Sequence, residues 1–83
     1  MQITFKLYAS LSSYLPEGSE RNITSIDVPA DATANSVIDQ FNVPQDLIQI
    51  VLLNGVYLQP EERNQPVFHA GDTLAIWPPV AGG

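Results

Sequence analysis

The chain has 83 residues, a formal net charge of −6 and no cysteine. This length suits one domain, and the absence of thiols excludes disulfides, thiol catalysis and cysteine-ligated metal centres. The excess of negative charge argues against binding to nucleic acid or anionic membranes, because phosphate groups would repel the chain. It is compatible with solubility alone, or with an acidic face that steers the protein to a basic partner.

No segment approaches the ~20 apolar residues that a membrane span needs. The first residues also lack the basic region and apolar run of a signal peptide. We therefore expect a cytoplasmic protein that does not bind membranes.

The first third of the chain predicts a hairpin. Residues 2–8 alternate between apolar and polar positions, which is the period of a half-buried strand. Apolar residues spaced by three and four over 9–15 predict a short helical turn that Pro16 stops. Residues 22–28 alternate less regularly and predict a second strand, paired with the first.

The middle of the chain predicts one helix. Thr33 is a suitable N-cap, and the apolar positions of residues 34–41 follow the spacing of an amphipathic helix. We expect the helix to run roughly from Ala34 to Phe41 and to stop before Pro44, because the residue before a proline disfavours helical backbone. A further turn is expected at 45–47.

The last third predicts three strands. The apolar run at 48–53 indicates a strand buried on both faces. Asn54-Gly55 is a strong hairpin signal, with 56–58 as the return strand. After turns at 60–64 and 70–72, residues 73–77 alternate as a final strand, which Pro78-Pro79 ends because proline cannot donate into a sheet.

This order of elements predicts an α+β fold, with one main helix packed on a mixed sheet of four to five strands. It matches the β-grasp, or ubiquitin-like, arrangement. We expect a β-grasp domain over residues 1–77 and a flexible tail over 78–83.

The tail carries the chemistry that we expect of this chain. Pro78 and Pro79 favour an extended segment, and it continues through Val80 and Ala81 to Gly82 and Gly83. Such a slim end could enter a narrow tunnel in another protein, and glycine leaves the terminal carboxyl group uncrowded. A carboxylate must be activated before it can donate an acyl group. The chain has no glycine-rich phosphate loop, so a separate enzyme would activate Gly83.

The chain resembles the MoaD/ThiS family of β-grasp sulfur carriers along essentially its whole length. The resemblance is most specific where Gly71-Asp72-Thr73-Leu74 leads into the segment Trp77-Pro78-Pro79-Val80-Ala81-Gly82-Gly83. The opening Lys6-Leu7-Tyr8-Ala9-Ser10-Leu11 and the turn at Leu53-Asn54-Gly55 also resemble the family. The ending is closest to the small subunit of molybdopterin synthase.

This resemblance implies a cycle in which Gly83 is the reactive residue. An adenylating enzyme of the MoeB/ThiF kind, related to ubiquitin activators, would form a glycyl adenylate with ATP, and a sulfur donor would convert it to 1-thioglycine. The tail would then enter a MoaE-like large subunit and deliver sulfur in molybdenum cofactor biosynthesis. No cofactor would be bound to the chain itself.

Three other functions stay open. The compact segment 41–47 is similar to that of ThiS, which allows a carrier for thiamine or another thio-compound. A ubiquitin-like modifier joined to lysines of other proteins would use the same terminus. A plain interaction domain with an incidental Gly-Gly ending is the fourth possibility.

The remaining polar residues do not indicate an intrinsic active site. His69 stands alone and is expected in a loop, which argues against a metal or catalytic role. Glu61, Glu62 and Asp72 are expected on solvated turns. Ser10, Ser12 and Ser13 lack the partners that nucleophilic catalysis requires.

Two aromatic residues are candidate contacts to a partner protein. Trp77 faces away from Leu74 and Ile76 on the last strand. It is either packed under the helix or partly exposed at the base of the tail. We hypothesise that it forms an apolar docking patch with Val80 and Phe68, because aromatic side chains often anchor interfaces.

Overall fold

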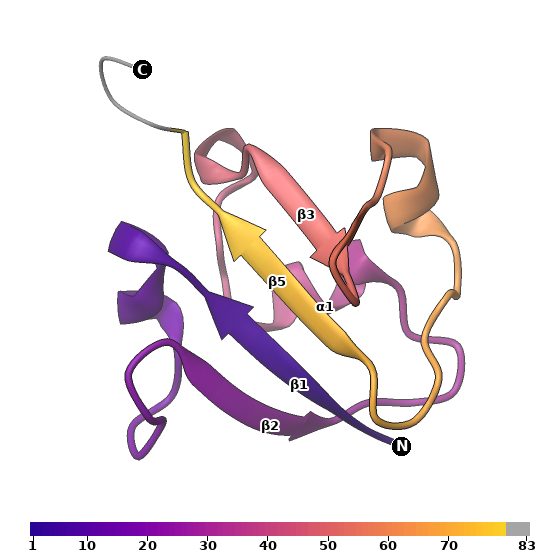
Figure 1. Ribbon diagram of the computed structural model, residues 1–83, viewed down its shortest axis with the longest axis horizontal. Helices are drawn as coiled ribbons and strands as arrows, with labels where there is room; N and C mark the ends of the chain where they lie inside the picture. The colour runs from indigo at the N-terminus through magenta and orange to yellow at the C-terminus, as the bar shows by residue number, and fades with distance from the viewer. Residues whose placement is uncertain (80–83) are drawn as a thin grey trace.

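The structure is a computed structural model that describes residues 1–79. These residues form a five-stranded mixed sheet in the order β2-β1-β5-β3-β4, with helix α1 (Ala34–Gln40) on one face (Figure 1). The strands are β1 (Gln2–Leu7), β2 (Ile23–Asp27), β3 (Ile50–Leu53), β4 (Val56–Tyr57) and β5 (Thr73–Trp77). The connections contain the 3₁₀ helices η1 (Ala9–Tyr14), η2 (Gln45–Leu47) and η3 (Pro60–Asn64). The predicted α+β, β-grasp architecture is confirmed.

The first and last strands lie side by side inside the sheet. β1 and β5 pair in parallel, whereas β1–β2, β3–β5 and β3–β4 pair antiparallel. Because β1 and β5 run in the same direction, Leu7 at the end of β1 lies opposite Ile76 near the end of β5. The chain therefore leaves the sheet at Trp77, next to the end of the first strand.

The core fills the space between α1 and one face of the sheet. Alternation along each strand sends every second side chain to this inner face, and α1 adds its own apolar side. The largest side chains with less than 2% exposure are Phe5, Ile3, Leu7, Leu11, Ile38, Leu74, Ile76, Val37 and Val51. Burying this apolar surface is the main favourable contribution to folding.

Helix α1 is capped at both ends. The Thr33 hydroxyl accepts a hydrogen bond from the Ser36 backbone N–H at 3.0 Å, and the Ser36 hydroxyl accepts one from the Thr33 N–H at 2.9 Å. At the other end Asn42 takes a φ of 59°, and the Val43 N–H donates to the Ile38 carbonyl at 3.2 Å. This left-handed cap ends the helix at Gln40, one residue before the predicted end at Phe41 and before Pro44 as predicted.

The third strand differs from the prediction. It begins at Ile50 rather than at residue 48, and only one of its faces is buried. Val51 is fully buried, whereas Ile50 is 37% exposed. The reason is that α1 covers one side of the sheet only, and the apolar residues of the other side remain in contact with solvent.

Candidate functional site

The face of the sheet opposite α1 carries a row of apolar side chains at the end where the tail begins. Ile50 of β3 lies opposite Trp77 of β5, and Tyr8 follows Leu7 on the other side of Trp77. The Tyr8 backbone N–H donates to the Ile76 carbonyl at 3.0 Å. The rings of Tyr8 and Trp77 stack with their centroids 3.9 Å apart and their planes 1° from parallel.

A second row crosses all five strands directly beside the first. The register of the sheet brings five residues into line: Tyr57, Leu52, Ala75, Lys6 and Ile23. Tyr57 is 43% exposed and Ile23 39% exposed, although side chains of these types are mostly withdrawn from water in folded proteins. We call the residues of the two rows the outer patch: Ile50, Trp77, Tyr8, Tyr57, Leu52, Ala75, Lys6 and Ile23.

The same face becomes polar away from the tail. The next positions in register are Thr73, Thr4 and Ser25, and beyond them Gln2 lies opposite Asp27. The apolar half of the face is therefore the half at which β5 passes into Pro78 and Pro79. Exposed apolar groups gathered in this way indicate a contact surface for another molecule.

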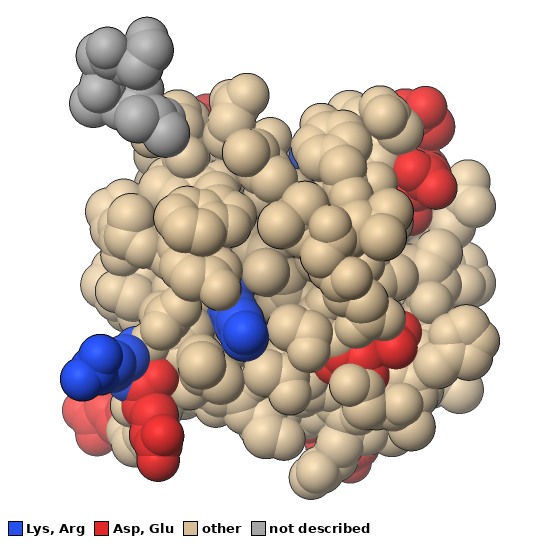
Figure 2. All heavy atoms as spheres, in the orientation of Figure 1, with Lys and Arg blue, Asp and Glu red and all other residues tan. Residues whose placement is uncertain are grey.

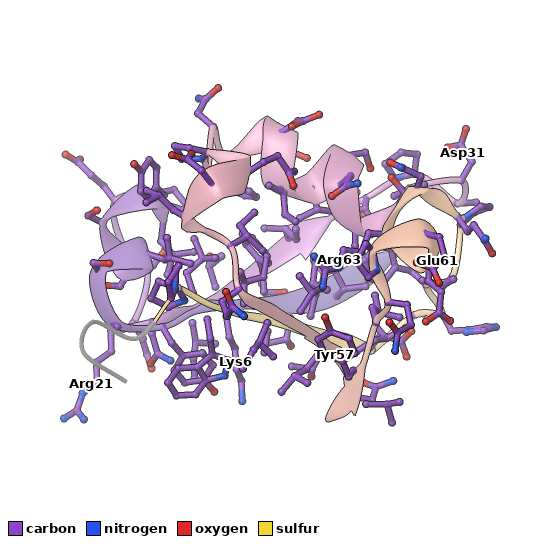
Figure 3. All side chains as sticks on the ribbon, turned by 90° about the horizontal axis from the view of Figure 1, so that it is seen from above. Lys6, Arg21, Asp31, Tyr57, Glu61 and Arg63 are labelled. Atoms are coloured by element: carbon purple, nitrogen blue, oxygen red, sulfur yellow. The ribbon has the colours of Figure 1, made fainter. Side chains whose placement is uncertain are left out.

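The outer patch contains one charged side chain, and it is basic. Lys6 comes from β1 and points to the side of the sheet opposite α1 (Figure 3). Figure 2 shows this face as largely uncharged, with one basic group near its middle, a second beside acidic groups at the lower left, and further acidic groups on the right. The negative net charge of the chain therefore does not describe this surface.

Tyr57 is held in place by Arg63, which the sequence did not single out. Arg63 is 9% exposed and donates from Nε to the Leu58 carbonyl at 3.1 Å and from Nη2 to the Tyr57 hydroxyl at 3.1 Å (Figure 3). Its guanidinium carbon lies 5.6 Å from the centre of the Tyr57 ring, within the range of a cation–π contact. Tyr57 thus has a fixed orientation at the margin of the outer patch.

A hydrogen-bonded clamp fixes the start of β5. The Asp72 carboxylate accepts from the Asn54 side chain at 3.0 Å and from the His69 backbone N–H at 2.8 Å. The Asn54 side-chain oxygen accepts from the Thr73 N–H at 2.8 Å. The Asn54 bond, then the His69 bond, lower the pKa of Asp72. The β3–β4 turn is thereby tied to the last strand, which carries Trp77.

The two aromatic residues predicted to contact a partner, Trp77 and Phe68, differ in their exposure to solvent. Trp77 is 38% exposed at the base of the tail, the second of the two placements considered for it. Phe68 is only 7% exposed and belongs to the core, which argues against its predicted contact with a partner. Pro78 and Pro79 directly follow β5, whereas Val80, Ala81, Gly82 and Gly83 lie outside the described residues.

Sequence reasoning missed Ile50, Leu52, Lys6 and Tyr8 as members of one surface. In the apolar run at 48–53, the inward-facing Val51 and the outward-facing Ile50 and Leu52 are all apolar. The sequence pattern therefore does not show which of them face solvent. The signal that was available is the excess of apolar residues at the outward positions of β3 and β5. This excess indicates a continuous apolar surface only once the strand order is known, in which β3 and β5 are neighbours.

Within residues 1–79 we find no pocket and no group of three or more acidic, histidine or cysteine side chains that could hold a metal. His69 Nδ1 approaches Asp72 at 3.9 Å in an exposed turn. Among the same residues, no helix has the length and apolar character to cross a membrane.

Within residues 1–79, the strand order, the one α-helix packed on the sheet and the last strand paired in parallel with the first define a small ubiquitin-like β-grasp protein. The sequence profile of the family described as Mut7-C ubiquitin matches residues 1–81. The chain belongs to this family.

Solved structures agree with this fold. The chain is similar to SAMP1 from Haloferax volcanii in a crystal structure, with 25% identity over all of both chains and a TM-score of 0.70. A crystal structure of H. volcanii small archaeal modifier protein 1 has 28% identity, with 95% of this chain and 98% of that chain covered and a TM-score of 0.68.

A more distant similarity involves a molybdopterin protein. A complex of subunits 1 and 2 of the molybdopterin-converting factor from Helicobacter pylori contains a chain with 17% identity, complete coverage of both chains and a TM-score of 0.59. At this identity the likeness shows the fold alone. No curated protein sequence matches the chain.

Proposed function

We propose that the chain is a sulfur carrier whose Gly83 carboxyl group is adenylated and then converted to a thiocarboxylate. In this proposal it serves as the small subunit of a molybdopterin synthase. The observation that supports it is the place where the chain leaves the sheet. Pro78 and Pro79 follow β5 directly at Trp77, which belongs to the outer patch, and the sequence continues from them to Gly82-Gly83.

The chemistry explains why other proteins must do the catalysis. A carboxylate is a poor electrophile, so its oxygen must first attack the α-phosphorus of ATP, with pyrophosphate as the leaving group. A sulfide-level donor can then attack the acyl carbon and displace AMP, which leaves sulfur on Gly83. The chain has no cysteine on which to carry sulfur instead.

The outer patch gives such enzymes a surface to bind. An enzyme that covers the patch holds Trp77 at its interface, and the residues after Trp77 then lead into its active site. Pro78 and Pro79 restrict the backbone next to the sheet, so binding of the patch also limits the directions that the tail can take. Such positioning lowers the entropic cost of bringing the reacting groups together.

The proposal is tested by adenylation of the purified chain. With the adenylating enzyme of the source organism, we expect exchange of labelled pyrophosphate into ATP that depends on the chain. Deleting Gly83 should abolish this exchange without a change in the thermal unfolding midpoint, because Gly83 lies six residues beyond the end of β5 at Trp77. Exchange that survives the deletion contradicts the proposal.

A protein modifier is the second candidate. It is favoured by the 28% identity to a small archaeal modifier protein, which exceeds the 17% identity to the molybdopterin-converting factor chain. A modifier would transfer the same activated glycine to a lysine amine and form an isopeptide bond. Covalent conjugates that resist reducing agents and disappear when Gly83 is deleted favour this function over sulfur transfer.

A further inference from the structure

The lysine and arginine side chains of this acidic protein form no salt bridge with any of the residues 1–79. The chain contains nine Asp and Glu residues and three Lys and Arg residues, and all twelve lie within residues 1–79. The salt bridges among the described residues are Met1 amine to Asp27 and His69 to Asp72. Lys6, Arg21 and Arg63 therefore form none with the described part of the chain, although Asp and Glu residues outnumber them threefold.

Of these three residues, Lys6 has the most unusual surroundings. It lies on an inner strand between Ala75 of β5 and Ile23 of β2, in the row that also contains Leu52 and Tyr57. No residue of the outer patch is acidic. Lys6 keeps its hydration in the free protein because its side chain is only partly buried and faces solvent (Figure 3).

A partner that covers the outer patch must remove this hydration. Burying an ammonium group in an apolar interface is strongly unfavourable unless an opposite charge replaces the lost water. Nothing in the patch can supply that charge. The compensating group therefore has to come from the partner.

We propose that Lys6 determines which proteins bind the outer patch, by requiring an apolar partner surface with a carboxylate opposite its amine. This inference rests on the proposed function, since it concerns the enzyme that activates or receives the tail. It reverses the expectation from net charge, which predicts a basic partner. In this proposal the partner's contact surface is acidic at the position of Lys6.

A second copy of the chain does not fit this surface. Two outer patches placed face to face would bring two Lys6 side chains into one apolar interface with no carboxylate between them. Bringing like charges together in such an interface is strongly unfavourable. The patch is therefore suited to a different protein with complementary charge.

The test compares two substitutions that change the net charge equally. Lys6→Glu and Arg21→Glu each lower the net charge by two, but Arg21 lies in the turn before β2 and outside the outer patch (Figure 3). The readout is the KM for the chain in pyrophosphate exchange with the adenylating enzyme. We expect Lys6→Glu to raise KM by at least about 30-fold. Arg21→Glu should change KM less than about threefold, because salt screens exposed charges.

Two further variants of Lys6 complete the test. Lys6→Arg should keep KM within about threefold, and Lys6→Met, which retains the apolar stem, should weaken binding as Lys6→Glu does.

Equal effects of Lys6→Glu and Arg21→Glu, with an active wild type, overturn the role of Lys6 but leave the proposed function intact. A lack of exchange in every variant overturns both. A wild-type dimer that Trp77→Ala dissociates would assign the patch to a second copy and also overturn the inference.

Discussion

Tyr8 and Trp77 stack across the β1–β5 pair, with 3.9 Å between ring centroids, at the point where the chain leaves the sheet. The two residues are 69 positions apart in sequence, and the parallel pairing of the first and last strands brings them together. Neither ring belongs to the core, because Trp77 is 38% exposed and Tyr8 is half-buried. The stack thus orders the base of the tail and forms the apolar row nearest to it.

The stack should contribute a measurable coupling energy. We expect Tyr8→Ala and Trp77→Ala to destabilise the protein, and the double variant to lose less than the sum of the single losses. Paired aromatic rings contribute about 0.5–1.5 kcal/mol beyond their buried area. Urea unfolding of the four proteins gives this coupling energy. Additive effects of the two substitutions would show that the rings do not interact.

Arg63 should stabilise the protein through its hydrogen-bonding geometry rather than its charge alone. Arg63→Ala removes the bonds to the Leu58 carbonyl and the Tyr57 hydroxyl, and we expect a loss of about 2 kcal/mol in the free energy of unfolding. Arg63→Lys keeps the charge but not the planar fork, so it should recover only part of this loss. A lysine variant as stable as the wild type would contradict this account.

Asn42 should be replaceable by glycine but not by alanine. Its φ of 59° ends α1 in the left-handed region, which costs a residue with a Cβ atom roughly 1–2 kcal/mol and glycine almost nothing. We expect Asn42→Ala to lower the thermal unfolding midpoint and Asn42→Gly to leave it close to the wild-type value. Equal midpoints for the two variants would argue against the left-handed cap.

The Asp72 clamp should make stability depend on pH in acid. The pKa of Asp72 is lowered below its ordinary value of 3.8, chiefly by the Asn54 side chain and then by the His69 N–H. Ionised Asp72 therefore stabilises the folded state fully above the unfolded pKa, and this contribution disappears as the pH falls through the folded pKa. We expect Asp72→Asn to cost about 1 kcal/mol at neutral pH.

The measurement is urea unfolding of the wild type and the Asp72→Asn variant across the acid range. Their difference should shrink steadily below a pH of about 4, because the wild-type carboxylate becomes protonated there. A difference that stays constant down to a pH of about 2 would show that the charge of Asp72 does not stabilise the fold.

Local sequence signals predicted most of the elements. Alternation predicted β1 and β5, the Thr33 cap and apolar spacing predicted α1, and Asn54-Gly55 predicted the β3–β4 hairpin. These signals operate within a few residues, so they are readable without the fold. The predicted end of α1 at Phe41 is one residue beyond Gln40, and the left-handed backbone at Asn42 was not predicted because asparagine adopts it only in some contexts.

The outer patch could not be predicted in the same way. Its members come from all five strands, and they adjoin only because β1 and β5 pair in parallel at the centre of the sheet. In β3, moreover, both faces are apolar, so alternation does not separate inner from outer residues. The chemistry of the tail was predicted from its composition and a family resemblance, and Gly83 lies outside the described residues.

The central claim is that Gly83 accepts sulfur, and intact mass spectrometry of the chain tests it most directly. The purified chain is incubated with the adenylating enzyme, ATP, magnesium and a sulfur donor, and the Gly83-deleted chain serves as the control. The account predicts that the full chain gains the mass difference between one sulfur and one oxygen atom, while the control stays unchanged. An unchanged mass of the full chain, with an enzyme that demonstrably adenylates it, would contradict the account.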